Sequence, residues 1–177
     1  MKDLYNYIFE KLNIKDIKRQ YTCCPKTREE LKSILGKRLI KNENADLNDI
    51  DVSKITDMSY LFFNLHPHDI DISEWNISNV TSMRAMFWEC QKFNSDLSKW
   101  DVSNVTNMDS IFSGCEEFNS DLSKWNVSKV ADMYKMFDGC KNFDSNLNSW
   151  DVGNVTDMQD MFWECDSLKN KPSWYKE

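Results

Sequence analysis

Apolar positions along most of this chain recur at a fixed interval of 25 residues, and the polar stretches between them recur in the same register. Tryptophan marks the interval, at Trp75, Trp100, Trp125 and Trp150. A period of about 20 to 50 residues is typical of proteins that stack copies of one unit, because a single unit is too small to bury its own apolar face. The pattern therefore predicts a stack of repeated units.

Five other rows of apolar side chains keep the same interval. They are Val52, Ile77, Val102, Val127 and Val152; Ile55, Val80, Val105, Val130 and Val155; Met58, Met83, Met108, Met133 and Met158; Phe62, Phe87, Phe112, Phe137 and Phe162; and Leu65, Cys90, Cys115, Cys140 and Cys165. Five copies run from about Leu47 to the C-terminus, with irregular edges where Ile50 replaces the tryptophan and Trp174 comes one residue early. Irregular edge copies suit a stack, because its end faces meet water.

The spacing within one unit predicts its local structure. Apolar residues three and two apart over residues 97–102 fit a short strand. Over residues 105–115 the apolar intervals become three, three, one and three, which fits one face of a short helix with Thr106 at its N-cap. The expected fold class is an α/β repeat solenoid of five strand-plus-short-helix units with an N-terminal helical cap.

The first 46 residues do not repeat, and their pattern predicts two helices that cover the first unit. One helix would carry Leu4, Ile8 and Leu12 on one face. The other would begin at the capping-box pattern from Thr27 to Glu30. Its apolar stripe would consist of Leu31, Ile34, Leu35 and Ile40. We therefore expect a helical cap over 1–46 and five repeats over 47–177, together one compact unit; the alternative is that the first segment binds a partner.

Two stretches of the unit resemble a known family. They are Trp100 to Met108, with the sequence Trp-Asp-Val-Ser-Asn-Val-Thr-Asn-Met, and Met161 to Cys165, with the sequence Met-Phe-Trp-Glu-Cys. On these residues the chain resembles the 25-residue BspA-like repeat, also called the DUF285 repeat, over about residues 47–174. The resemblance implies a right-handed, leucine-rich-repeat-like solenoid used for adhesion or binding, often on bacterial surfaces. It implies no catalytic residue.

Composition and charge narrow the function classes. The chain has 177 residues, of which 41% are hydrophobic and 29% charged, and no helix-length apolar run predicts a membrane span. Its net charge of −7 favours a protein partner with a basic surface and disfavours direct contact with nucleic acid. The first residues lack the apolar stretch of a secretion signal, which predicts a cytoplasmic location; the cell surface is the alternative if a signal has been removed.

Six cysteines raise the question of disulfides or a metal site. Four of them occupy one apolar row, so we expect reduced, buried thiols that fill the core. Ligands on successive rungs form a line and not the tetrahedron that zinc requires, so no metal or cofactor is expected. No phosphate-binding loop, activated nucleophile or carboxylate pair stands out, so we expect a protein that is not an enzyme.

Two rows of side chains are candidates for binding a partner protein. The first is an acidic and amide stripe, whose alternative role is a solvated face. It consists of Asp51, Asn76, Asp101, Asn126 and Asp151. The second follows the core phenylalanines and is aromatic toward its ends, at Phe63, Trp88 and Trp163. Its alternative role is to cover the side of the stack.

Three hypotheses about function follow. The leading one is a non-enzymatic, protein-binding solenoid that acts inside the cell by occupying a surface of a partner, as an inhibitor of a basic nucleic-acid-handling effector. A phage-type anti-defence or anti-CRISPR protein would be one instance, and a monomer is the favoured state. The second hypothesis is a bacterial cell-surface adhesion or immune-recognition module. The third is an enzyme, which would need a pocket with clustered titratable groups.

Overall fold

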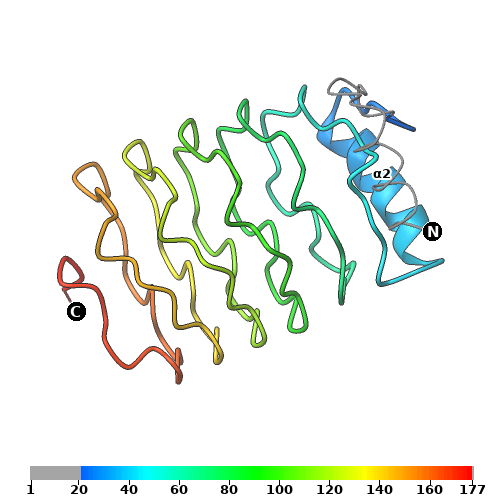
Figure 1. Cartoon of the computed structure of the whole chain (residues 1–177). Helices are drawn as coiled ribbons and strands as arrows, with labels where there is room; N and C mark the ends of the chain where they lie inside the picture. Colours follow the sequence, from blue (N-terminus) through cyan, green and yellow to red (C-terminus); the bar gives the residue numbers. More distant parts are fainter. Residues whose placement is uncertain (1–20, 177) are drawn as a thin grey trace, which may run out of the picture.

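The computed structural model of this chain describes residues 21–176. After an N-terminal helix, the chain winds into coils of 25 residues that stack one on another toward the C-terminal end (Figure 1). Isolated parallel bridges join equivalent positions of successive coils, in the order Asp57, Ser82, Asn107, Asp132 and Asp157. The predicted helix with Leu4, Ile8 and Leu12 lies outside the described residues.

The prediction of an α/β, leucine-rich-repeat-like solenoid of five strand-plus-short-helix units was wrong. In the described part of the chain the one helix is α2 (Arg28–Leu39), which precedes the repeats. The coils contain turns and isolated bridges but no β-sheet and no helix over residues 40–176. The stack therefore consists of turns that are closed by backbone bonds within each coil and joined by backbone bonds between coils.

The predicted helix over 105–115 is replaced by a series of tight turns. The amide of Ile111 donates to the carbonyl of Met108 at 3.2 Å, which closes one such turn. Ser110 has a positive φ of 54°, and its amide donates instead to the carbonyl of Tyr134 in the next coil at 2.8 Å. An α-helix needs φ near −60° and bonds from each amide to the carbonyl four residues earlier. The apolar spacing resembled a helix because each tight turn also returns a side chain to the core after three residues.

The predicted strand over 97–102 is also a turn. The amide of Trp100 donates to the carbonyl of Leu97 at 3.1 Å, and the Asp96 carboxylate accepts a bond from the amide of Ser98 at 2.9 Å. Thr106, expected at a helix N-cap, donates its hydroxyl to the carbonyl of Thr81 in the preceding coil at 3.2 Å. Side-chain oxygens that bond nearby backbone favour turns over strands, which is the physical reason for the error.

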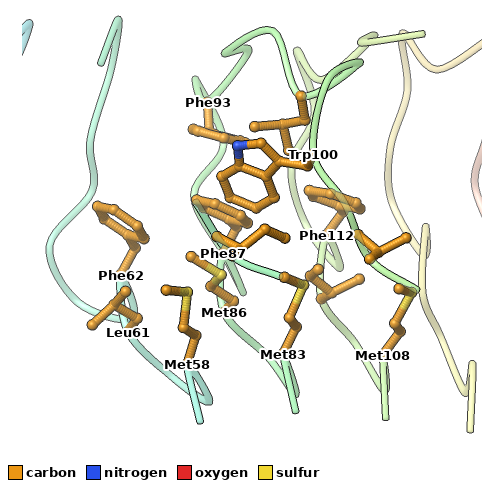
Figure 2. Packing of buried hydrophobic residues seen from close by; sticks show 14 of the residues in the cluster. Met58, Leu61, Phe62, Met83, Met86, Phe87, Phe93, Trp100, Met108 and Phe112 are labelled. Carbon is orange, nitrogen blue, oxygen red and sulfur yellow. The ribbon is translucent and has the colours of Figure 1, made fainter. Parts of the chain in front are cut away.

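The apolar rows form one continuous core inside the coils. Phe87 stacks on Phe112 of the next coil with ring centroids 5.7 Å apart, and on Phe93 of its own coil at 4.0 Å. Figure 2 shows that Met58, Met83 and Met108 also lie in a row, each at the same level of its coil. The phenylalanine and methionine rows are buried up to the last coil, where Met158 is half-buried. Stacked apolar rows are the main stabilising contribution, since each large aromatic buries about 150 to 250 Å².

Helix α2 covers the first coil. Thr27 is its N-cap and accepts a bond from the amide of Glu30 at 3.2 Å, which confirms the predicted start. Leu31, Leu35 and Leu39 face the core, whereas the side chain of Ile40 is 88% exposed, so the prediction that Ile40 belongs to the stripe was wrong. The division into a cap over 1–46 and repeats over 47–177 stays a prediction.

Candidate protein-binding surfaces

The predicted acidic and amide row lies on the surface and closes turns. Each member accepts a bond from the backbone amide two residues later, at 3.0 to 3.2 Å. The donors to Asp51, Asn76, Asp101, Asn126 and Asp151 are Ser53, Ser78, Ser103, Ser128 and Gly153. One oxygen of each side chain is thus bound to its own coil, and the repeat itself explains why the row contains only Asp and Asn.

The bonds from serine also affect the charge of this row. The hydroxyl and amide of Ser53 lower the pKa of Asp51, and those of Ser103 lower the pKa of Asp101. Both carboxylates are therefore ionised at neutral pH, and they add to the acidic surface of the stack. Sequence reasoning missed the turn-closing role, although the recurring Asp/Asn-x-Ser pattern signals such turns.

An aromatic cluster lies beside the first two repeats. Phe63 and Trp88 stack with centroids 4.9 Å apart and ring planes 9° apart, and Tyr60 meets Phe63 edge-on at 6.3 Å. The guanidinium of Arg84 lies 5.6 Å from the centre of the Tyr60 ring and pairs with Asp109 at 2.8 Å. We call Tyr60, Phe63, Trp88 and Arg84 the aromatic cluster.

Part of the aromatic cluster is accessible. The side chain of Trp88 is 36% exposed, and Tyr60, Arg84 and Trp88 help to line a hollow of about 150 Å³. Aromatic and arginine side chains are the residue types that contribute most to binding energy at protein interfaces. The cluster is thus chemically suited to bind a protein.

The rest of the predicted aromatic row differs from coil to coil. Ser113 is buried, and Asp138 is half-buried beside Lys135, whose amine lies 3.7 Å from its carboxylate. Burial raises the pKa of Asp138, and the charge of Lys135 opposes the rise. Trp163, at the C-terminal end, is 62% exposed. The structure therefore stacks Phe63 on Trp88, whereas Trp163 lies three coils further along the same row.

The four cysteines of the repeat row donate weak hydrogen bonds between coils. The thiol of Cys115 lies 3.1 Å from the carbonyl of Phe87, and that of Cys140 lies 3.1 Å from the carbonyl of Phe112. Burial raises the pKa of Cys90 and Cys165 to about 12. Such thiols stay protonated at neutral pH and are neither nucleophiles nor metal ligands in that form. Sequence reasoning predicted their burial but not the bond.

The described part of the chain contains neither a cluster of metal-binding side chains nor a helix that could span a membrane. Among residues 21–176, no group of three or more His, Cys, Asp or Glu side chains is arranged to hold a metal ion. Over the same residues the structure has no helix with the length and apolar character that crossing a bilayer requires. All six cysteines are free.

These features define a repeat protein whose coils stack one on another. The chain belongs to the family described as "Mycoplasma protein of unknown function, DUF285", whose family model matches residues 30–121 and again residues 66–175. The resemblance to the BspA-like, DUF285 repeat is therefore confirmed. No curated protein and no solved structure matches the chain.

Proposed function

We propose that this chain is a non-enzymatic binding protein that occupies a surface of another protein. The observation that carries the proposal is the aromatic cluster, in which Phe63 stacks on a partly exposed Trp88 at 4.9 Å while Arg84 lies over Tyr60. Rigid aromatic rings provide contact area at a low cost in conformational entropy, and pre-stacked rings lower that cost further.

The charge of the chain supports a partner with a basic surface. The net charge is −7, and the ionised carboxylates of Asp51 and Asp101, whose pKa is lowered by bonds from serine, lie along one side of the stack. An acidic surface attracts a basic protein over roughly 8 Å at physiological salt and speeds their association. It repels the phosphates of nucleic acid, which makes direct binding to DNA or RNA unfavourable.

The finer form of the proposal is an inhibitor of a basic, nucleic-acid-handling effector. Proteins that bind nucleic acid have basic grooves, and a small acidic chain can compete for such a groove. A phage-type anti-defence or anti-CRISPR protein is the instance suggested by the acidity and the size of 177 residues.

The test is affinity capture from host cells followed by identification of the bound protein. The bait is the full chain, in parallel with a double variant of the aromatic cluster, Phe63→Ser with Trp88→Ala. The matched control is Ile40→Ser, because Ile40 is 88% exposed and lies at the end of α2, outside the cluster. We expect one basic protein that the chain and the control retain and that the double variant retains about tenfold less.

Two results would contradict the proposal. One is equal recovery of every captured protein by the double variant and the wild-type chain. The other is a captured protein without a basic surface whose binding does not weaken between 0.05 and about 0.5 M salt, since screening reduces attraction between exposed charges. The inhibitor form additionally requires that the purified chain lowers the nucleic-acid binding or cleavage of the captured protein.

A further inference from the structure

The last coil lies at the C-terminal end of the stack (Figure 1), and alternate backbone amides along its outer edge have no acceptor within residues 21–176. In the coil before it, alternate amides donate to carbonyl oxygens of the last coil at 2.8 to 3.0 Å. These bonds join Met133 to Asp157, Lys135 to Gln159, Phe137 to Met161 and Gly139 to Trp163. The equivalent amides of the last coil are those of Met158, Asp160, Phe162 and Glu164, and none of them donates to an acceptor within residues 21–176. A row of unpaired backbone groups is a template for adding another chain.

A cavity of about 570 Å³ lies along this edge. Met158, Phe162 and Trp163 line one part of it, and Tyr175 belongs to the final segment that lines another part. Tyr175 packs edge-on against Phe162 at 5.0 Å, while Trp163 is 62% exposed. Gln159, Asp160, Glu164, Lys171 and Lys176 also line it, so the cavity has the position and the mixed apolar and charged lining that a further rung of the stack would need.

The donors at this edge determine which occupant fits. Since the edge offers amides, the occupant must supply carbonyl oxygens, and a second copy docked through the same face would place donors against donors. The opposite end of the stack is covered by α2, where Lys32 donates to the carbonyl of Tyr60 at 2.8 Å and Arg28 to that of Ser59 at 3.4 Å. An extended segment of another protein is the occupant that supplies a free row of carbonyls.

Interior coils indicate the side chains of such a segment. Ion pairs join side chains 25 residues apart in successive coils: Arg84 with Asp109 at 2.8 Å, Lys99 with Glu74 at 3.2 Å and Lys141 with Glu116 at 2.9 Å. At the open edge, Asp160 and Glu164 flank the amide of Phe162 with negative charge, and Lys171 and Lys176 of the final segment line the same cavity. A basic side chain one rung further on would form the same kind of pair.

Aromatic stacking gives the segment a third feature. Phe63 and Trp88 occupy equivalent positions of neighbouring coils and stack at 4.9 Å. Trp163 holds the same position in the last coil and has no ring stacked on it within the described residues. An aromatic side chain in the incoming segment would stack on Trp163 in the same way.

We propose that the C-terminal edge of the stack binds an extended, basic segment of a partner protein as one further rung. Carbonyl oxygens of the segment accept bonds from the amides of the last coil, its basic side chains pair with Asp160 and Glu164, and its aromatic side chain stacks on Trp163. The inference rests on the protein-binding function proposed above but uses a surface three repeats away from Trp88. An experiment can therefore disprove either proposal while the other remains valid.

The probe is a synthetic peptide with the sequence of residues 154–164 and the changes Asp160→Lys and Glu164→Lys. Its register is that of the last coil, so its carbonyls and its tryptophan are spaced to meet the open edge. The peptide is titrated into the ¹⁵N-labelled full chain, with backbone amide shifts and amide hydrogen exchange as readouts. The control peptide has the unchanged sequence of residues 154–164, and the protein variants are Trp163→Ala and, as a matched control, Trp88→Ala.

We expect exchange of the four edge amides to slow at least about tenfold on saturation with the lysine peptide. The unchanged, acidic peptide should bind about tenfold more weakly or not at all, because it brings like charges together. Trp163→Ala should weaken binding by about tenfold and Trp88→Ala should leave it unchanged. Equal affinity for both peptides, or binding without slower exchange at the edge amides, would overturn the inference. Shifts centred on Trp88 would also overturn it while leaving the proposed function intact.

Discussion

The indole nitrogen of Trp125 lies 3.0 Å from the carbonyl oxygen of Leu97, 28 residues earlier, and donates a hydrogen bond to it. The same bond recurs in every repeat that has a tryptophan. It joins Trp75 to Leu47, Trp100 to Ile72, Trp150 to Leu122 and Trp174 to Leu147, at 2.8 to 3.1 Å. The tryptophan row thus combines burial with a buried polar bond that ties each coil to the one before.

Replacing an interior tryptophan should therefore cost more than the loss of its ring alone. We expect Trp125→Ala to lower the free energy of unfolding by about 3 to 5 kcal/mol, because it leaves a cavity and an unpaired carbonyl. Trp125→Phe should cost about 1 to 3 kcal/mol, mostly through the lost bond. Trp174→Ala should cost less than Trp125→Ala, because Trp174 is only half-buried. Urea unfolding measures all three variants, and equal losses for Trp125→Ala and Trp174→Ala would contradict this account.

The cysteines should differ sharply in reactivity. We expect Cys24, which is exposed, to be alkylated by iodoacetamide at pH 8 in the folded protein. Cys90, Cys115 and Cys140 are buried, and burial raises their pKa, so they should be modified only after unfolding. Mass spectrometry of proteolytic peptides, with and without urea, reads the outcome site by site. Labelling of Cys115 at the rate of Cys24 in the folded chain would show that the core is not packed as described.

The turn-closing aspartates should make stability depend on acid. Bonds from neighbouring amides and hydroxyls lower the pKa of Asp96, Asp101 and Asp121 in the folded state. A lowered pKa contributes stability that is present above the ordinary value of 3.8 and is lost as the pH falls through the lowered pKa. The urea concentration at the midpoint of unfolding should therefore decrease once the pH is lowered below about 4.

Substitutions at Asp101 separate the hydrogen bond from the charge. Asn76 and Asn126 accept the same bond in their coils at 3.2 Å, so Asp101→Asn should leave stability at pH 7 nearly unchanged and reduce the dependence on acid. Asp101→Ala removes the acceptor and should cost about 0.5 to 1 kcal/mol. If Asp101→Asn costs as much as Asp101→Ala at pH 7, the side-chain oxygen is not what stabilises the turn.

Two glycines should differ in their tolerance of alanine. Gly114 and Gly139 both have positive φ, 76° and 72°, which alanine adopts only at a cost. A Cβ on Gly114 would lie 3.2 Å from the Cα of Glu89, whereas the nearest atom to one on Gly139 is 3.5 Å away. We expect Gly139→Ala to cost about 1 kcal/mol and Gly114→Ala about 1 to 3 kcal/mol.

A third glycine provides the control for this comparison. Gly153 has no positive φ, and a Cβ there would lie 3.2 Å from Oδ1 of Asp151. The other coils place serine at this position beside the same kind of side chain, so Gly153→Ser should stabilise the chain by about 0.4 to 1 kcal/mol. Thermal unfolding of the three variants ranks them directly. A larger loss for Gly139→Ala than for Gly114→Ala would contradict the argument from close contact.

The sequence alone was sufficient to predict the rows and their period, because identical side chains such as Phe87 and Phe112 meet only when copies stack in register. It was not sufficient to predict the path of the backbone. Ala85 and Lys135 have positive φ of 50° and 49°, which neither residue type signals. These residues hold that conformation because their amides donate to the next coil, at Asp109 and Gln159. These hydrogen bonds join different coils, and the local conformational preference of a residue type does not reveal them.

The binding surfaces also could be predicted from the sequence only in part. Phe63 and Trp88 were candidates from their position after the core phenylalanines, and the structure stacks them. The pairing of Arg84 with Tyr60 and Asp109 could not be foreseen, because it depends on which side each turn faces. Nor does any residue type reveal the open edge at Phe162, since backbone amides are the same in every residue.

The shared register of the coils makes the length of this molecule adjustable. Removing residues 101–125 would join Trp100 to Asn126, and each side of the junction would keep the kind of neighbour it has now. Duplication or loss of whole 25-residue blocks in the gene would thus preserve both α2 and Trp163 while changing the span between them in steps of about 5 Å. Evolution can therefore change the distance between the two ends of the stack without changing either end.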